Sequence, residues 1–415
     1  MRATMTESRT EARELDRADE LAPLRARFDL PEGLVYLDGN SLGPLPRGVA
    51  ERVAEVISTQ WGRSLIRGWN DHGWMDLPAR VGDRIGALIG AAPGTVIAAD
   101  STSLNVAKVL AAALQLRPDR AVVLSDSGNF PTDLYMAQGL LAALGDGREL
   151  RVVAPEEVAA SITRSDVAVL MLTHVDYRTG RMHDMPALTA AAHQAGALVV
   201  WDLAHSAGAV PVALDAAGVD FAVGCSYKYL NGGPGAPAFA YVNDRHAADV
   251  RPLLSGWMGH AAPFDFDLEY RPIEGVQRLR VGTPPIIALS ALDAALDVWD
   301  DVYMAAVRAK SMALTSRFVE GVEANCRDVH LVSPRDPEQR GSQVSFAHPQ
   351  GYAVVQALIA DGVIGDFRAP DIMRFGFAPL YTSFADVDEA VQRMAVVLDE
   401  RRFDEPGFRQ RAAVT

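Results

Sequence analysis

The chain has 415 residues, with 39 Lys plus Arg against 53 Asp plus Glu and a formal net charge of −14. Nucleic-acid binding needs clustered positive charge, so this acidic balance excludes nucleic acid as an expected partner. No stretch approaches the roughly 18 apolar residues of a membrane span, and the two cysteines are expected to be reduced thiols, so we expect a cytoplasmic protein without a membrane partner.

In chain order, the first 30 residues are charged and weakly patterned, which predicts a short helix and an arm that packs on another element. A turn-rich loop over 36–44 precedes a helical pattern over 46–60. One face of this pattern is apolar and carries Val49, Val53, Val56 and Ile57. Short apolar runs then alternate with Ala-rich helical patterns to about residue 245.

Six of these runs are predicted strands. They are Ala121–Ser125, Leu150–Ala154, Val167–Leu172, Ala197–Trp201, Phe221–Gly224 and Phe239–Val242. The runs are apolar throughout, which is typical of strands buried on both faces of a mainly parallel sheet. The sequence therefore predicts an α/β domain of three layers, with helices on both faces of the sheet.

Beyond the turn at 282–285, one long helical stretch over 286–323 is predicted to lead into a smaller α+β domain. Its predicted strands are Val329–Val332, Gln343–Phe346 and Met373–Gly376, and its predicted helices are Tyr352–Asp361 and Val387–Arg402. The expected organisation is an N-terminal arm (1–45), a large domain (46–285) and a small C-terminal domain (286–415).

Only three basic residues are lysines, and none follows a P-loop pattern. The nine histidines show no metal-ligand spacing, so no metal is expected. Lys108 and Lys310 lie in helical patterns and are interpreted as solvated helix charges. Lys228 instead follows a strand and precedes a glycine-rich turn, a position where α/β sheets gather ligands. It is a candidate Schiff-base nucleophile.

Asp202 and His205 come directly after the strand Ala197–Trp201. A carboxylate there, with Lys228 at another strand end, is the pair that a pyridoxal phosphate site requires. The lysine would hold the aldehyde carbon, and Asp202 would keep the pyridine nitrogen protonated. Taken singly, Asp202 could equally cap a helix, and His205 could be a core residue.

A phosphate cradle is predicted where a helical pattern begins after Asp100. Thr102 or Ser103 would present a hydroxyl and a backbone N–H there, although ordinary helix capping is the alternative. Phe130, after the strand Ala121–Ser125, could stack on a cofactor ring or could simply form a turn.

With these residues in place, the chain resembles the fold type I, class V pyridoxal phosphate enzymes, and within them the kynureninase family. The strings that carry the resemblance are Tyr36-Leu37-Asp38-Gly39-Asn40-Ser41-Leu42-Gly43, Asn129-Phe130-Pro131-Thr132-Asp133, Trp201-Asp202-Leu203-Ala204-His205-Ser206-Ala207-Gly208, Ser226-Tyr227-Lys228-Tyr229-Leu230-Asn231-Gly232-Gly233-Pro234-Gly235, Ser255-Gly256-Trp257 and Arg280-Val281-Gly282-Thr283-Pro284-Pro285. The first, second and fourth strings are the most particular to that family.

The resemblance implies a pyridoxal phosphate site in which Lys228 forms the Schiff base and Asp202 pairs with the pyridine nitrogen. The other implied cofactor residues are Thr102, Ser103 and Tyr227 at the phosphate, Phe130 on the ring, and Thr132, Asp133, His205, Trp257 and Thr283 around them. It further implies a homodimer with shared active sites, to which Trp257 and Thr283 of the neighbouring subunit contribute.

For the substrate, the resemblance implies that Arg374 clamps the α-carboxylate, for which a guanidinium fork is suited. Asn40 and Ser41 are further candidates, with turn formation as the alternative role. Trp69 and Thr283 stand where relatives that prefer 3-hydroxykynurenine carry His and Asn, so unsubstituted kynurenine is favoured. Trp74 lies close by in the same loop and is the alternative to Trp69.

The implied activity is that of a hydrolase acting on a carbon–carbon bond: L-kynurenine is cleaved to anthranilate and L-alanine, in tryptophan catabolism or NAD supply. Lys228 would remove the Cα proton, and Tyr227 is the candidate acid/base for later proton transfers, or only a phosphate ligand.

Three alternatives remain open at this stage. A cysteine desulfurase would need a cysteine on a mobile C-terminal loop, and Cys326 is the only candidate, at the end of a helical pattern. An aminotransferase or epimerase would use the same scaffold, and a non-catalytic vitamin-binding protein would bind the cofactor without turnover.

Overall fold

The computed structural model describes residues 2–411. It divides into two compact units. The large unit comprises Gly48–Tyr177 and His183–Asp297, and the small unit comprises the described parts of Met1–Arg47, Arg178–Met182 and Val298–Thr415. Within the described residues, no helix is both long and apolar enough to cross a membrane.

The large unit is built on a seven-stranded sheet in the order β2-β8-β7-β6-β5-β3-β4. Its elements are α2 (Val49–Glu55), α3 (Gly68–Asp71), α4 (Leu77–Leu88), β2 (Val96–Ala98), α5 (Thr102–Gln115), β3 (Val122–Asp126), α6 (Pro131–Leu144), β4 (Glu149–Val153), α7 (Val158–Ser161), β5 (Val167–Thr173), α8 (Met185–Gln194), β6 (Leu198–Asp202), β7 (Phe221–Gly224), β8 (Phe239–Val242) and α9 (Ile286–Ala295). Strands β4, β3, β5, β6 and β7 run parallel, whereas β8 is antiparallel to β7 and to β2. The prediction of a mainly parallel sheet is confirmed.

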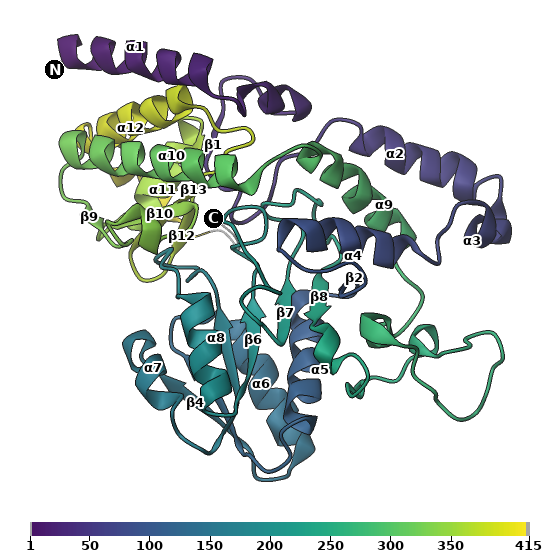
Figure 1. Cartoon of the computed structure of the whole chain (residues 1–415). Helices are drawn as coiled ribbons and strands as arrows, with labels where there is room; N and C mark the ends of the chain where they lie inside the picture. Colours follow the sequence, from purple (N-terminus) through teal and green to yellow (C-terminus); the bar gives the residue numbers. More distant parts are fainter. Residues whose placement is uncertain (1, 412–415) are drawn as a thin grey trace. The chain divides into compact units, whose positions relative to one another are not determined.

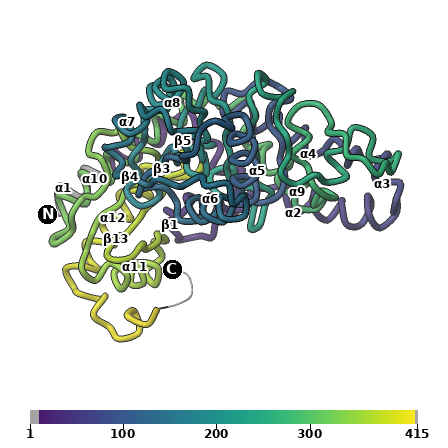
Figure 2. The backbone as a smooth tube through the Cα atoms, turned by 90° about the horizontal axis from the view of Figure 1, so that it is seen from below, coloured from purple at the N-terminus to yellow at the C-terminus, as the bar shows by residue number. Residues whose placement is uncertain are grey.

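Helices cover both faces of this sheet. Figure 2 shows α7 and α8 on one side of β3 and β5, and α6 on the other. Strands β5 and β6 are buried along their whole length, as their unbroken apolar runs predict. The prediction that Leu150–Ala154 is buried on both faces is wrong, because β4 is the edge strand and Val152 is 43% exposed.

The small unit holds a four-stranded antiparallel sheet in the order β12-β13-β10-β9 and a two-stranded parallel pair, β1 and β11. Its elements are α1 (Arg2–Ala18), β1 (Val35–Tyr36), α10 (Met304–Asn325), β9 (His330–Leu331), β10 (Gln343–Ala347), α11 (Gly351–Ala360), β11 (Val363–Ile364), β12 (Asp366–Arg368), β13 (Ile372–Gly376) and α12 (Phe384–Asp399). Figure 1 shows α10 and α12 beside this sheet. Phe318 of α10 sits against Phe346, Phe375 and Phe377 in the core.

Two helical predictions need correction. The single stretch expected over 286–323 is broken into α9 and α10, and Asp301 between them has a positive φ of 65° that no helix continues. Ile57 is 43% exposed and does not share the apolar face of α2. Ile57 lies in a π-helical turn over Val56–Trp61, where the 3.6-residue spacing on which the predicted face depends does not hold.

The interpretation of two lysines as solvated charges is also wrong. Lys108 is 1% exposed and Lys310 is 7% exposed. Each ammonium is paired with a carboxylate, Asp100 for Lys108 and Asp19 for Lys310. Burying an ammonium is costly unless it is paired and hydrogen-bonded, so these partners explain how helical lysines can face the interior.

Candidate active site

A pocket of about 250 Å³ opens in the large unit where the parallel strands end. It is lined by Thr102, Ser103, Phe130, Thr132, Asp133, Thr173, Tyr177, Asp202, Ala204, His205, Cys225, Tyr227 and Lys228. The last residues of β5 and β6, and the loops and helix starts that follow β2, β3, β5, β6 and β7, supply these side chains, as is usual for a ligand site at the carboxyl edge of a sheet. The structure therefore gathers in one cavity nine side chains that the sequence singled out.

Lys228 follows β7, in a turn held by backbone hydrogen bonds. The N–H of Asn231 donates to the carbonyl of Lys228 at 2.9 Å, and Gly233 takes a positive φ of 88° that a side chain would oppose. Nζ of Lys228 lies 2.9 Å from Nε2 of His205, which is 5% exposed. The amine thus points into the pocket and is oriented by an imidazole.

Asp202 and Asp133 form a buried carboxyl pair, 5% and 2% exposed. Oδ1 of Asp202 accepts a 2.7 Å hydrogen bond from the N–H of Ala204. Burial raises the pKa of Asp202, and the charge of Lys228 opposes that rise. Burial and then the charge of Asp202 raise the pKa of Asp133 well above its ordinary value.

Helix α5 presents its first turn to the pocket. Oγ of Ser101, the N-cap, accepts a hydrogen bond from the N–H of Leu104 at 3.4 Å. Because Ser101 does the capping, the hydroxyls of Thr102 and Ser103 are left to line the cavity. Together with the first N–H groups of the helix they form a site suited to a phosphate.

Phe130 directly precedes α6, at its N-cap position, and remains 41% exposed at the pocket. Its N–H donates to Oδ1 of Asn129 at 2.7 Å, which fixes the turn. The ring meets that of Tyr177 edge-on, with centroids 5.1 Å apart and an interplanar angle of 87°. An aromatic face at this position can cover a planar cofactor ring.

Tyr227 and Cys225 come shortly before Lys228 in the chain and line the same pocket, and both side chains are neutral at pH 7. Burial, and then the neighbouring thiol, raise the pKa of Tyr227 above its ordinary value. Burial raises the pKa of Cys225 as well. Tyr227 can therefore donate a hydrogen bond from a neutral phenol.

Three predicted site residues of the large unit lie outside the lining of this pocket. Trp257 is 41% exposed, Thr283 is exposed, and Trp69 is partly exposed with its ring edge-on to Trp74 at 5.7 Å. Trp74 is the buried member of that pair at 9% exposure, and its Nε1 donates to Gln60 at 2.9 Å. Trp69 is thus the more accessible of the two tryptophans.

The small unit brings together the predicted substrate residues Arg374, Ser41 and Asn40. Arg374 is 1% exposed, and its Nη2 donates to Oγ of Ser41 at 2.9 Å. Its Nε donates to Oδ1 of Asp366 at 2.7 Å, and Nη2 also donates to Asp366. Asn40 is fully buried, and within the described residues neither atom of its amide has a hydrogen-bond partner. Such an amide is a group that a bound polar ligand can satisfy.

Sequence reasoning missed two of the polar side chains that line the large-unit pocket. Thr173 is the last residue of β5 and is paired in register with Asp202. Tyr177 lies in the loop that follows β5. The position of Thr173 at a strand end was the available signal, since carboxyl ends of neighbouring parallel strands meet at one edge.

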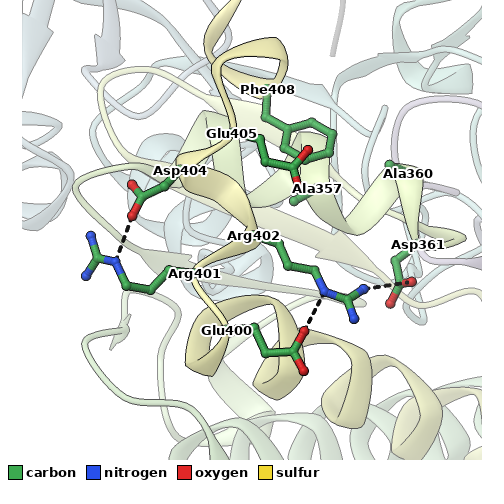
Figure 3. A pocket seen from close by; sticks show the side chains of 9 residues that line it. All are labelled: Ala357, Ala360, Asp361, Glu400, Arg401, Arg402, Asp404, Glu405 and Phe408. Carbon is green, nitrogen blue, oxygen red and sulfur yellow. Dashed lines mark hydrogen bonds and ion pairs between the residues drawn. The ribbon is translucent and has the colours of Figure 1, made fainter.

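A larger pocket, of about 720 Å³, lies in the small unit between α11 and the segment after α12 (Figure 3). It is lined by Ala357, Ala360, Asp361, Glu400, Arg401, Arg402, Asp404, Glu405 and Phe408. Its arginines are paired within the pocket itself: Arg402 with Glu400 at 2.8 Å and with Asp361 at 3.4 Å, and Arg401 with Asp404 at 2.7 Å. It contains no predicted site residue, and size alone does not make it the active site.

Cys326 ends α10 and is 8% exposed. Burial, with Asp399 nearby, raises the pKa of this thiol to about 12. A thiol of that kind is not a thiolate nucleophile at neutral pH. The geometry therefore disfavours the desulfurase alternative.

The pocket fits pyridoxal phosphate on its own chemistry. It offers a lysine, a buried carboxylate, an exposed aromatic face and hydroxyls at a helix N-terminus. In addition, no donor among the described residues reaches the buried Oδ2 of Asp133, so the pocket holds a polar group that a ligand can satisfy.

Comparison with known proteins gives a family match and close relatives. The family model "Kynureninase C-terminal domain" matches residues 307–394. A kynureninase of Burkholderia pseudomallei (strain 1106a) is 53% identical over 414 residues, covering 98% of this chain and 100% of the relative. A kynureninase of Pseudomonas fluorescens is 51% identical over 415 residues, with the same coverage.

Solved structures that resemble the chain show the same fold at low identity. The apo structure of a cysteine desulfurase from Thermococcus onnurineus NA1 has a TM-score of 0.77 at 20% identity, covering 91% of this chain and 98% of that one. A C-DES mutant with glycine covalently linked to its PLP cofactor has a TM-score of 0.78 at 19% identity, covering 89% and 98%. These likenesses confirm the predicted fold class.

Proposed function

Because this chain belongs to the kynureninase family, we propose that its large-unit pocket binds pyridoxal phosphate and that the enzyme hydrolyses L-kynurenine to anthranilate and L-alanine. The observation that carries the site is Nζ of Lys228, 2.9 Å from His205 in a cavity that also contains Asp202. When bound, pyridoxal phosphate supplies an electron-withdrawing ring that stabilises negative charge at the substrate's Cα.

Lys228 has two tasks in this proposal. Its amine would hold the cofactor through the aldehyde carbon, and the same amine is the base that would take the proton from the substrate's Cα. His205, 2.9 Å away, orients the amine by a hydrogen bond. A base must be held within hydrogen-bond reach of the proton that it takes. The contact with His205 and the turn after β7 hold the amine of Lys228 in one position in the pocket.

Asp202 holds the pyridine nitrogen in its protonated form. The hydrogen bond from the N–H of Ala204 and the charge of Lys228 favour an ionised Asp202. Burial and the charge of Asp202 raise the pKa of the neighbouring Asp133 well above its ordinary value. The charge of Lys228 and the backbone donor thus act on Asp202 in the direction that its proposed role requires.

Thr102, Ser103 and Tyr227 bind the phosphate, and Phe130 covers the ring. The first turn of α5 supplies hydroxyl and N–H donors, while the neutral phenol of Tyr227 adds one more. Thr132 lines the same cavity. The raised pKa of Tyr227 suits it to donating a hydrogen bond or a proton rather than to acting as a phenolate base.

Arg374 is the proposed partner of the substrate's α-carboxylate, with Ser41 and Asn40 beside it. The support is local: Asp366 and Ser41 fix the guanidinium, and the buried amide of Asn40 lacks partners within the described residues. Trp69 and Thr283 favour unsubstituted kynurenine over 3-hydroxykynurenine.

We place the enzyme in the cytoplasm as a homodimer with shared active sites. Trp257 and Thr283 lie outside the pocket lining of their own chain, which leaves them available to a partner. Phe264, Phe266 and Leu268, in the same region as Trp257, are 62%, 77% and 104% exposed. Apolar side chains gathered in this way indicate a surface that is covered in an assembly.

The test is anthranilate fluorescence after L-kynurenine is added to protein reconstituted with pyridoxal phosphate, with 3-hydroxykynurenine in parallel. Prompt anthranilate release supports the activity, and Lys228→Ala is expected to abolish both turnover and the absorption of lysine-bound cofactor. Full activity in Lys228→Ala would remove the lysine from the mechanism. A clear preference for the 3-hydroxy substrate would overturn the roles of Trp69 and Thr283.

A further inference from the structure

Lys108 is a fully buried lysine that the proposed chemistry does not use. It lies in the middle of α5 at 1% exposure, and it is absent from the pocket lining. Its ammonium forms an ion pair with Asp100 and donates to the backbone carbonyl of Leu279 at 2.8 Å. A third acceptor, Oδ1 of Asn105, lies at 3.5 Å. A buried charge with this set of partners ties several segments of the chain together.

The carboxylate that Lys108 holds belongs to a residue with an unusual backbone. Asp100 has a φ of +50°, a left-handed conformation that is uncommon for residues other than glycine, although Asp adopts it more readily than most. It joins the end of β2 to Ser101, the N-cap of α5. The N–H of Ala238 donates to its carbonyl at 2.9 Å, so the ammonium and the sheet hold Asp100 from two directions.

This junction sets where the phosphate-binding hydroxyls begin. Thr102 and Ser103 come directly after the N-cap and line the pocket. Asn105 adds a further contact, since its Nδ2 donates to the carbonyl of Ala99 at 2.8 Å. A shift of the Asp100 turn would move both hydroxyls and the first N–H groups of α5, and such donors bind a phosphate only when correctly oriented.

The other contact of Lys108 reaches a distant part of the sequence. Leu279 ends a short 3-10 helix and is followed by the segment that leads to Thr283. Lys108 thus connects the start of α5 with a segment expected to serve the neighbouring subunit's site.

We propose that Lys108 is a positioning residue that holds the phosphate-binding turn of α5 in place, through Asp100 on one side and the Leu279 carbonyl on the other. The inference rests on the proposed cofactor, because it assigns Lys108 to one part of that molecule, its phosphate. Lys108 does not touch the cofactor itself.

The experiment compares pyridoxal phosphate with pyridoxal, which has the same ring and aldehyde but no phosphate. Full-length wild type and Lys108→Met, stripped of cofactor, are titrated with each compound, and binding is followed by the absorption of the Lys228-bound form. For Lys108→Met we expect the dissociation constant for pyridoxal phosphate to rise about tenfold, while the dissociation constant for pyridoxal changes less than about twofold. The tenfold rise is the size expected when well-oriented hydrogen bonds to a charged group are lost.

The chain offers a matched control in Lys310→Met. Lys310 is also a buried helical lysine, with Asp19 at 2.7 Å and the carbonyl of Pro379 at 2.6 Å, but it lies in the small unit. The Lys310→Met substitution is expected to lower thermal stability and to leave unchanged the ratio of the dissociation constants for pyridoxal phosphate and pyridoxal. Asp100→Asn is a second test variant, because Asp100 is more accessible and its loss threatens folding less. It is expected to weaken pyridoxal phosphate selectively, by about threefold.

Two results would overturn the inference while leaving the cofactor in place. One is an equal loss of affinity for both compounds in Lys108→Met and Asp100→Asn, which would indicate general damage to the pocket. The other is unchanged affinity for pyridoxal phosphate in these variants. If wild type binds neither compound at Lys228, the proposed cofactor and the inference both fail.

Discussion

Asp38 and Asp366 are two carboxyl groups that stand beside the same two guanidinium groups, those of Arg374 and Arg368. Arg374 and Arg368, against the effect of burial, lower the pKa of Asp366. Burial and the charge of Asp366 raise the pKa of Asp38 to about 7. Asp366 is therefore the permanent anion of the cluster, and Asp38 changes charge near neutral pH.

The titration of Asp38 predicts a pH dependence of stability. Its pKa rises from 3.8 to about 7 on folding, so the folded state binds more protons between those values. The contribution of Asp38 to stability is thus fully present below pH 4 and lost as the pH rises to 7, at up to about 1.4 kcal/mol per pH unit. Urea unfolding at pH 5, 6, 7 and 8 should show a shallower decline for Asp38→Asn than for wild type. Parallel curves would contradict the assignment.

Asp366 holds the arginine proposed for the substrate's carboxylate. Asp366→Ala removes the acceptor of Nε of Arg374 and frees the guanidinium to leave its position. We expect KM for L-kynurenine to rise about tenfold with a smaller change in kcat, and cofactor affinity to stay unchanged. Ser41→Ala removes the 2.9 Å contact to Nη2 of Arg374 and the 2.7 Å hydrogen bond to Oδ2 of Asp366 but keeps the Asp366–Arg374 pair, so it is the comparison variant with a smaller rise in KM. An unchanged KM in Asp366→Ala would count against the role of Arg374.

Asp220 directly precedes β7, whereas Lys228 follows the other end of this strand. Burial acts to raise the pKa of Asp220, but hydrogen bonds from His193 at 2.8 Å and His246 at 2.7 Å, with Arg245, hold the pKa below the ordinary value. Its stabilisation is therefore present at neutral pH and lost as the pH falls below about 4. Asp220→Asn should cost about 3–5 kcal/mol at pH 7, measured by urea unfolding. An unchanged free energy of unfolding would show that the ion pairs of Asp220 make no net contribution to stability. The folded Asp220→Asn enzyme is expected to keep the wild-type KM.

Shared active sites can be tested by mixing subunits. Lys228→Ala and Trp257→Ala are each expected to be nearly inactive as pure proteins. In either pure protein, every active site lacks one of the two side chains that it needs. After the two are unfolded and refolded together, hybrid dimers should regain about half of the activity per dimer, from the one site in which both residues are intact. Absence of any recovery, with hybrids demonstrated by native mass spectrometry, would place Trp257 in the site of its own chain.

Much of the pocket could be predicted because its residues follow buried strands. The runs that become β5, β6 and β7 are apolar throughout, so their ends, and with them Asp202 and Lys228, are visible in the sequence. Periodicity gave no signal for β2 or β12, which have three residues each. Elements that short are fixed by their sheet partners rather than by a local pattern.

The burial of Lys108 and Lys310 could not be predicted from the helical pattern. Lys310 pairs with Asp19 and Lys108 contacts Leu279, partners that lie far along the chain from each lysine. A helical wheel shows on which face of the helix a lysine lies, but only the tertiary fold decides whether a carboxylate packs against that face. The same holds for Ile57, where a π-helical turn changes the register of the face.

The scarcity of lysine has a practical consequence for chemical labelling. Lys108 and Lys310 are buried and ion-paired, whereas Lys228 is only partly buried. Among the lysine side chains, an amine-reactive reagent therefore meets an accessible target only at the large-unit pocket that Lys228 lines. Modification of Lys228 in the cofactor-free protein would therefore report on whether that pocket is open. Cross-linkers that react with lysine side chains would not react elsewhere on the surface of the protein.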